Sequence, residues 1–210
     1  MTGIVFAARA EAQPFLEMSG ASPVTDVPMQ LYAVAQPSLM IVVSGMGKVA
    51  AALATQCLIR EHGIRRIVLG GACGVLSDDP LFASGGIFRV TRASEGAPGP
   101  GIPDTPTSCE PALWTQLPPA TLVTLERPMF DNQRRQELAA YGELVDMEGA
   151  VVARTAAMYD VPCTIIKGVT DFAGDGHRRI LRDNLAGVSL AVANTLWEGL
   201  QQHASSRFKA

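Results

Sequence analysis

Three carboxylates stand at or just after the ends of apolar segments, where they could act on a ligand. Glu11 follows the apolar run Gly3–Ala8, Glu148 lies in the segment VDMEGA, and Asp171 comes just after the apolar run Cys163–Val169. Each has an ordinary alternative, Glu11 as a solvated acid in a helix's first turn and the other two as helix N-caps. If the apolar runs are strands of an α/β sheet, all three acids meet at the edge where such sheets bind ligands.

A group of carboxylates suits the cleavage of a glycosidic bond. That reaction needs a proton donor for the leaving group and a carboxylate that activates water. The three histidines offer no competing Ser-His-Asp or Cys-His arrangement, because His62 precedes an expected strand, His177 lies in a loop and His203 is near the C-terminus.

The elements that must position these acids follow from the hydrophobic pattern. Short apolar runs predict strands at Gly3–Ala8, Met29–Ala35, Leu39–Gly45, Arg66–Gly71, Gly86–Thr91, Thr121–Leu125, Leu144–Met147 and Pro162–Val169. Helical spacing predicts helices at Lys48–Arg60, Asp131–Tyr141, Glu148–Tyr159 and Arg178–Gln202. We therefore expect an α/β fold in a single domain, residues 1–210, with a central twisted mixed (mostly parallel) sheet flanked by helices. The Pro- and Gly-rich segment Gly96–Thr107 is expected to be a loop, either a binding loop or a surface excursion.

Composition narrows the setting in which the protein works. The net charge of -3 gives no support to nucleic-acid binding, and no apolar stretch approaches the ~20 residues that span a bilayer. The first residues do not have the pattern of a signal peptide. The four cysteines have no spacing that suggests a zinc site. We expect a cytoplasmic protein with reduced thiols, no metal, and no nucleic-acid or membrane partner.

The glycine turn Gly45–Ala50, GMGKVA, formally matches the G-x-G-x-x-A pattern of dinucleotide-binding folds. That pattern requires an acidic residue after the next strand, but the nearest acid, Glu61, precedes that strand. A Walker A loop fails as well, because Val49 stands where Ser or Thr would bind magnesium. A nucleotide- or dinucleotide-binding Rossmann-like protein stays open as the alternative of another class.

Several blocks in order resemble the nucleoside phosphorylase/nucleosidase superfamily, most closely the methylthioadenosine/S-adenosylhomocysteine nucleosidase-like proteins. These blocks are IVFAARAE (Ile4–Glu11), VVSGMGKVAAALA (Val42–Ala54), IVLGGACGVL (Ile67–Leu76), VDMEGAVVA (Val145–Ala153) and IIKGVTDFAGD (Ile165–Asp175). The last two are the most specific. The resemblance implies a nucleoside phosphorylase-like fold and an enzyme that needs no cofactor.

The resemblance also implies roles for individual residues. Asp171 would donate a proton to purine N7, Glu148 would bind the ribose 2′- and 3′-hydroxyls, and Glu11 would activate the attacking water. The other implied substrate-binding positions are Met147 against the sugar, Thr170 holding the carboxyl group of Asp171, the backbone of Gly71 and Ala72 along the pocket, and Phe130 stacked on the base. Ala72 replaces a serine that is common in the family.

The implied reaction is hydrolysis of a 5′-substituted adenosine to free adenine, with methylthioadenosine, S-adenosylhomocysteine or a bulkier relative as substrate. The alternative is a phosphate-dependent purine nucleoside phosphorylase. Phosphorylases of this superfamily carry a G-D-P-x-R-type loop near the N-terminus, where this chain reads Ala7-Ala8-Arg9-Ala10-Glu11. Glu11 would repel phosphate, although Arg9 could be recruited to bind it. An inactive binding protein is a further alternative. The family usually forms dimers or larger assemblies, so we expect a homo-oligomer that binds a small-molecule nucleoside.

Overall fold

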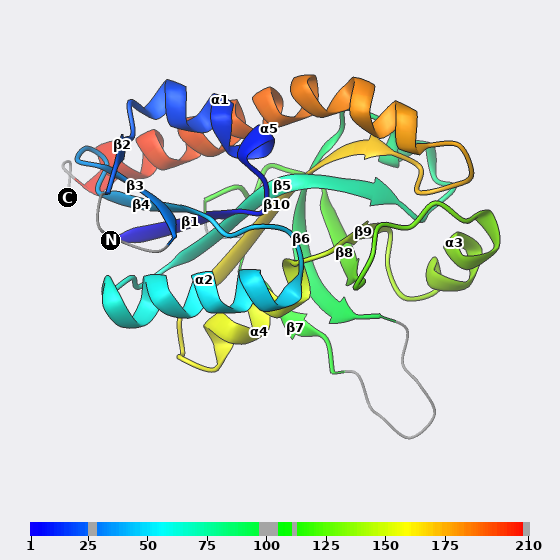
Figure 1. Ribbon diagram of the computed structural model, residues 1–210, viewed down its shortest axis with the longest axis horizontal. Helices are drawn as coiled ribbons and strands as arrows, with labels where there is room; N and C mark the ends of the chain where they lie inside the picture. Colours follow the sequence, from blue (N-terminus) through cyan, green and yellow to red (C-terminus); the bar gives the residue numbers. More distant parts are fainter. Residues whose placement is uncertain (25–28, 97–104, 111–112, 208–210) are drawn as a thin grey trace.

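One large mixed sheet with helices on both faces organises the molecule (Figure 1). The computed structural model describes residues 1–24, 29–96, 105–110 and 113–207. The strands are β1 (Thr2–Phe6), β2 (Ser22–Pro23), β3 (Gln30–Val34), β4 (Leu39–Val43), β5 (Ile67–Val75), β6 (Ile87–Glu95), β7 (Thr107–Ser108), β8 (Pro119–Thr124), β9 (Leu144–Asp146) and β10 (Cys163–Asp171). The helices are α1 (Arg9–Ser19), α2 (Lys48–Glu61), α3 (Asn132–Leu138), α4 (Gly149–Ala157), α5 (Arg178–Arg207) and the 3-10 helix η1 (Pro80–Phe82).

The centre of the sheet is parallel. Strands β4, β1, β5 and β10 lie side by side in parallel, with β3 added antiparallel beyond β4. On the other side of the sheet, β10 pairs antiparallel with β6, and β6 pairs in parallel with β8. Strand β8 pairs in parallel with β9, and β9 pairs antiparallel with β5. Because β10 pairs with both β5 and β6, these five strands close into a circuit. The α/β fold class and the mixed sheet predicted from the sequence are confirmed.

Two hydrophobic clusters hold the layers together. Helices α1 and α5 cover one face of the sheet, where Phe15 and Leu196 pack with Ile4 and Phe6 (Figure 1). Helices α2 and α4 cover the other face, with Leu58 packed in its cluster. The four parallel strands are therefore buried on both sides, as their unbroken apolar sequence predicts.

The strands and helices differ from the prediction mainly at their ends. Strand β5 continues through the small-residue segment to Val75, and β6 continues to Glu95, both longer than expected. Helix α1 and the short strands β2 and β7 were not predicted, and Thr107 belongs to β7 rather than to the expected loop. The greater part of that loop, 97–104, lies outside the described residues. Within the described part of the chain, none of the helices is both long and apolar enough to cross a membrane.

Candidate active site

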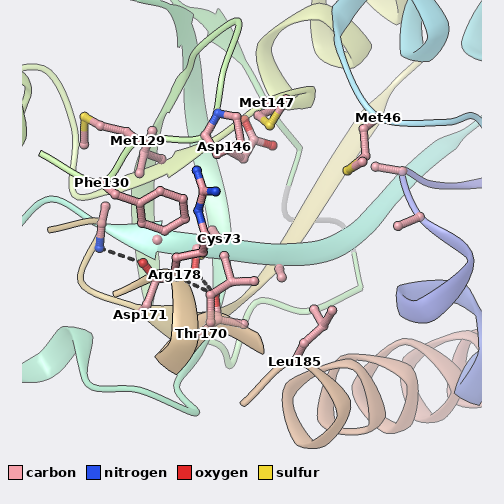
Figure 2. A pocket seen from close by; sticks show the side chains of 18 of the residues that line it. Met46, Cys73, Met129, Phe130, Asp146, Met147, Thr170, Asp171, Arg178 and Leu185 are labelled. Carbon is pink, nitrogen blue, oxygen red and sulfur yellow. Dashed lines mark hydrogen bonds between the residues drawn. The ribbon is translucent and has the colours of Figure 1, made fainter. Parts of the chain in front are cut away.

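A cavity of about 330 Å³ opens where β1, β5, β9 and β10 end, and the three acids from the sequence analysis all line it (Figure 2). Its walls are otherwise largely apolar. The lining residues that matter below are Glu11, Met46, Ala72, Phe130, Asp146, Met147, Glu148, Thr170, Asp171 and Arg178. The structure therefore brings together Glu11 and Asp171, two acids that are 160 positions apart in the sequence.

Glu11 lies in the first turn of α1, directly after β1. Its Oε2 accepts a hydrogen bond from the amide of Ala8 at 3.0 Å, and its Oε1 accepts one from the amide of Ala72 at 2.7 Å. Burial raises the pKa of Glu11, while the Lys167 ammonium and the two amides lower it. The alternative of a solvated helix acid is wrong, because only 9% of Glu11 is exposed.

Glu148 lies in the turn between β9 and α4. Its Oε1 accepts a hydrogen bond from the amide of Gly47 at 2.7 Å, and the residue is buried. Burial and the nearby carboxylate of Asp146 raise the pKa of Glu148 to about 7. Glu148 stands at the N-cap position of α4, but the interpretation that its side chain caps the helix is wrong, because it makes no capping hydrogen bond. The amide of Gly149 instead donates to Asp146 Oδ2 at 2.8 Å.

Asp171 ends β10 and is held from two sides. The Thr170 hydroxyl donates to Oδ1 at 2.8 Å, and the amide of Ala173 donates to Oδ2 at 2.8 Å. Burial raises the pKa of Asp171, although these hydrogen bonds and His177 act in the opposite direction. The N-cap interpretation is wrong here too, because α5 does not begin until Arg178.

The remaining predicted residues lie around these acids. Phe130 and Met147 line the cavity, as does Ala72. Figure 2 shows Phe130 and Arg178 on the same side of the cavity as Asp171, with Met46 on the opposite side. The Arg178 guanidinium lies over the Phe130 ring, 5.2 Å from its centroid.

Gly71 lies behind Glu11 and is not one of the residues that line the cavity. A Cβ atom at Gly71 would come within 2.9 Å of Glu11 Oε1. The absence of a side chain at this position therefore leaves room for the carboxylate.

The buried ion pair of Lys167 and Asp146 at the cavity floor was not predicted from the sequence. Lys167 is 2% exposed, and its Nζ lies 2.7 Å from Asp146 Oδ2. A lysine is almost never this buried without a partner. A lysine within the apolar run of β10 was therefore a usable signal. Arg178, by contrast, gave no such signal, because it lies in a polar segment just before the long C-terminal helix.

The glycine turn before α2 binds a carboxylate of the protein itself. Gly47 immediately precedes α2, and the end of a helix where amides are free attracts anions. Here that place is taken by the protein's own Glu148 carboxylate. Arg9 is not one of the residues that line the cavity. Its side chain donates hydrogen bonds to Gln13 and to the Tyr32 hydroxyl and stacks on the Tyr32 ring.

Comparison with known proteins identifies the family. A family model described as the phosphorylase superfamily matches residues 3–103 and 107–195. The chain belongs to this superfamily. Comparison with curated protein sequences gave no match.

Solved structures share the fold over nearly the whole chain. One is a futalosine hydrolase mutant of Helicobacter pylori, with a TM-score of 0.86 and 16% identity over 96% of this chain and 98% of the other. A second is the 5′-methylthioadenosine/S-adenosylhomocysteine nucleosidase of the same organism, with a TM-score of 0.87 and 18% identity over 96% and 97%. A third is the corresponding Neisseria meningitidis enzyme in complex with methylthio-immucillin-A, with a TM-score of 0.84 and 19% identity over 96% and 98%. At 16% to 19% identity, these structures show that the chain shares their fold.

Proposed function

We propose that the protein is a purine nucleosidase that hydrolyses the N-glycosidic bond of a 5′-substituted adenosine and releases free adenine and the ribosyl product. The observation that carries this proposal is the meeting of Glu11, Glu148 and Asp171 in one buried cavity. Membership of the phosphorylase superfamily and likeness to nucleosidase structures support it.

In the proposed mechanism Asp171 protonates the leaving base. Burial raises its pKa, which favours the protonated form that a general acid needs. Phe130 lies on the same side of the cavity and offers a ring on which a purine can stack. Protonation at N7 makes the base a better leaving group, and positive charge builds up on the ribose as the bond breaks.

In the proposed mechanism Glu148 binds the ribose, and Glu11 activates the attacking water. Glu148 would accept hydrogen bonds from the 2′- and 3′-hydroxyls, with Met147 against the sugar. Glu11 would take a proton from the attacking water, and its raised pKa makes it a stronger base than an exposed carboxylate. Two backbone amides hold Glu11 in place for this step.

Hydrolysis fits this cavity better than phosphorolysis. A phosphate ion at the position of the water would meet the carboxylates of Glu11 and Glu148. Arg9, the candidate cation for phosphate near the N-terminus, is engaged with Tyr32 and Gln13. Arg178 lines the cavity but lies over Phe130, where the base is placed. Lys167 is buried and paired with Asp146.

A mass-spectrometric screen of purine nucleosides, with and without phosphate, tests the proposal. We expect the purified protein to release free adenine from a 5′-substituted adenosine without phosphate. Strict dependence on phosphate, with ribose 1-phosphate as product, would establish a phosphorylase instead. We further propose that the enzyme acts as a homo-oligomer, because Met46 at the cavity and Val49 and Leu53 of α2 are large apolar side chains that are exposed in the single chain.

A further inference from the structure

The cavity floor contains a hydrogen-bonded group of three buried residues that the proposed reaction does not itself use. Asp146 Oδ1 accepts a hydrogen bond from the Thr124 hydroxyl at 2.6 Å, and Asp146 Oδ2 lies 2.7 Å from Lys167 Nζ. All three side chains are buried. The free energy needed to remove two charges from water offsets much of the attraction between them. A buried ion pair is therefore weak evidence for a purely stabilising role.

Two members of this group fix the start of α4. The amide of Gly149 donates to Asp146 Oδ2 at 2.8 Å, and the amide of Ala150 donates to the Thr124 hydroxyl oxygen at 2.8 Å. These are amides of the first helical turn, which has no partners within the helix. Glu148 directly precedes them, so its backbone is held while its carboxylate is left for Gly47 and for a ligand.

Lys167 also lies close to Glu11. Lys167 pairs in register with Gly71 of β5, and paired residues of neighbouring strands point to the same face. Gly71 has no side chain, and the Glu11 carboxylate lies over the vacant position. Both groups also reach Ala72, where Glu11 Oε1 accepts from the amide at 2.7 Å and Lys167 Nζ lies 3.5 Å from the carbonyl oxygen.

We propose that Thr124, Asp146 and Lys167 are positioning residues: Asp146 and Thr124 hold Glu148 at the start of α4, and the Lys167 ammonium lies beside Glu11 and favours its charged form. The ionisable groups whose charges act on Lys167 are Glu11 of α1, Asp146 of β9 and Glu148 before α4, and Lys167 in turn acts on the Cys73 thiol of β5. After burial, which raises it, the Lys167 charge is the largest influence on the pKa of Glu11 and lowers it. The effect on turnover rests on the proposed function.

Two variants that remove the Lys167–Asp146 ion pair separate a positioning role from a structural one. Lys167→Met leaves Asp146 as an unpaired buried anion, so we expect a marked loss of thermal stability. The double variant Lys167→Met with Asp146→Asn contains no buried charge at either position and keeps an oxygen for the amide of Gly149. We expect its melting temperature to return close to that of the wild type.

We expect the double variant to regain thermal stability but not turnover. In the double variant we expect kcat/KM for the nucleoside to stay at least about tenfold below wild type. We also expect the acid limb of its pH profile to move up, because the lost Lys167 charge lowers the pKa of Glu11 by more than the lost Asp146 charge raises it. Recovery of both turnover and pH profile would reduce the pair to a structural element and overturn the inference. Arg135→Met removes the cation of an ion pair with Asp78 away from the cavity, and this control should leave the pH profile unchanged.

A second readout keeps this inference distinct from the proposed function. If the wild-type protein cleaves no nucleoside, the proposed function fails, and the pKa of Glu11 can still be read by carbon NMR titration. The same upward shift is then expected in the double variant. An unchanged Glu11 titration would overturn the role given to Lys167.

Discussion

At the scale of single residues, Asp171 and Asp175 form a matched pair for testing the general acid. Asp171 lines the cavity, whereas Asp175 lies four residues further on and accepts a hydrogen bond from Asn132. An amide at position 171 keeps one oxygen to accept the hydrogen bond of the Ala173 amide, but it cannot protonate N7. Its NH2 group can donate to the Thr170 hydroxyl oxygen, whose proton can go to the Cys73 carbonyl oxygen. We expect Asp171→Asn to lower kcat about 10²- to 10⁴-fold with little change in melting temperature. Asp175→Asn should retain turnover, and a near wild-type rate in Asp171→Asn would remove Asp171 from the acid role.

The buried carboxylate of Glu148 makes stability depend on pH. Its pKa rises from an ordinary value of 4.5 to about 7, so between these values the folded state holds a proton that the unfolded state has released. The contribution of Glu148 to stability is therefore present below its unfolded pKa and is lost as the pH rises through 7. We expect the free energy of unfolding of the wild type, relative to Glu148→Gln, to fall between about pH 5 and pH 7.5 in urea titrations. A difference that does not change with pH would contradict the raised pKa.

At the scale of the elements, two of the three glycines of β5, Gly70 and Gly71, are required for different reasons. A Cβ atom at Gly70 would meet Leu196 of α5 at 2.6 Å, and one at Gly71 would meet the Glu11 carboxylate at 2.9 Å. We expect Gly71→Ala to displace Glu11 and lower kcat about tenfold or more, measured in the same nucleoside assay. Gly187→Ala in α5 is the control, because its Cβ meets nothing within 4 Å. That change should leave turnover intact and stabilise the helix by up to about 1 kcal/mol. Full activity in Gly71→Ala would show that the position of Glu11 does not depend on Gly71.

The same strand shows where prediction from sequence succeeds and where it stops. Continuous apolar runs identified β4 and β10, because strands buried on both faces need such side chains. The predicted strand stopped at Gly71, since the small residues that follow give no periodic signal, and only pairing with β10 and β9 shows that β5 continues to Val75. Helix α1 was missed because Pro14 lies inside it. The three acids could be found from their places after apolar runs, whereas the pairing of Lys167 with Asp146 depends on which strands are neighbours in space.

At the scale of the whole molecule, the exposed apolar surface of interest has large side chains beside the cavity and along α2, and one more at the end of the neighbouring α4. It consists of Met46, Val49, Leu53 and Met158, whose exposed fractions lie between 53% and 78%. Val49 and Leu53 are one turn apart on α2, and Met158 ends the neighbouring α4 (Figure 1). Met46 belongs to this surface and also lines the cavity. Large apolar side chains gathered at the edge of a binding cavity are typical of surfaces that are covered in the working protein.

We expect a second copy of the chain to cover this surface and close the cavity beside Met46. Light scattering coupled to size exclusion should therefore give the mass of a dimer or larger assembly for the wild type. Val49→Glu places a charge on the surface and should release monomers, with a raised KM because the cavity loses part of its wall. Leu190→Glu is the matched control, since Leu190 is an equally large exposed apolar residue on α5, on the opposite face of the sheet. A monomeric wild type, or an assembly that Leu190→Glu dissociates and Val49→Glu does not, would show that the surface over α2 and α4 is not the interface.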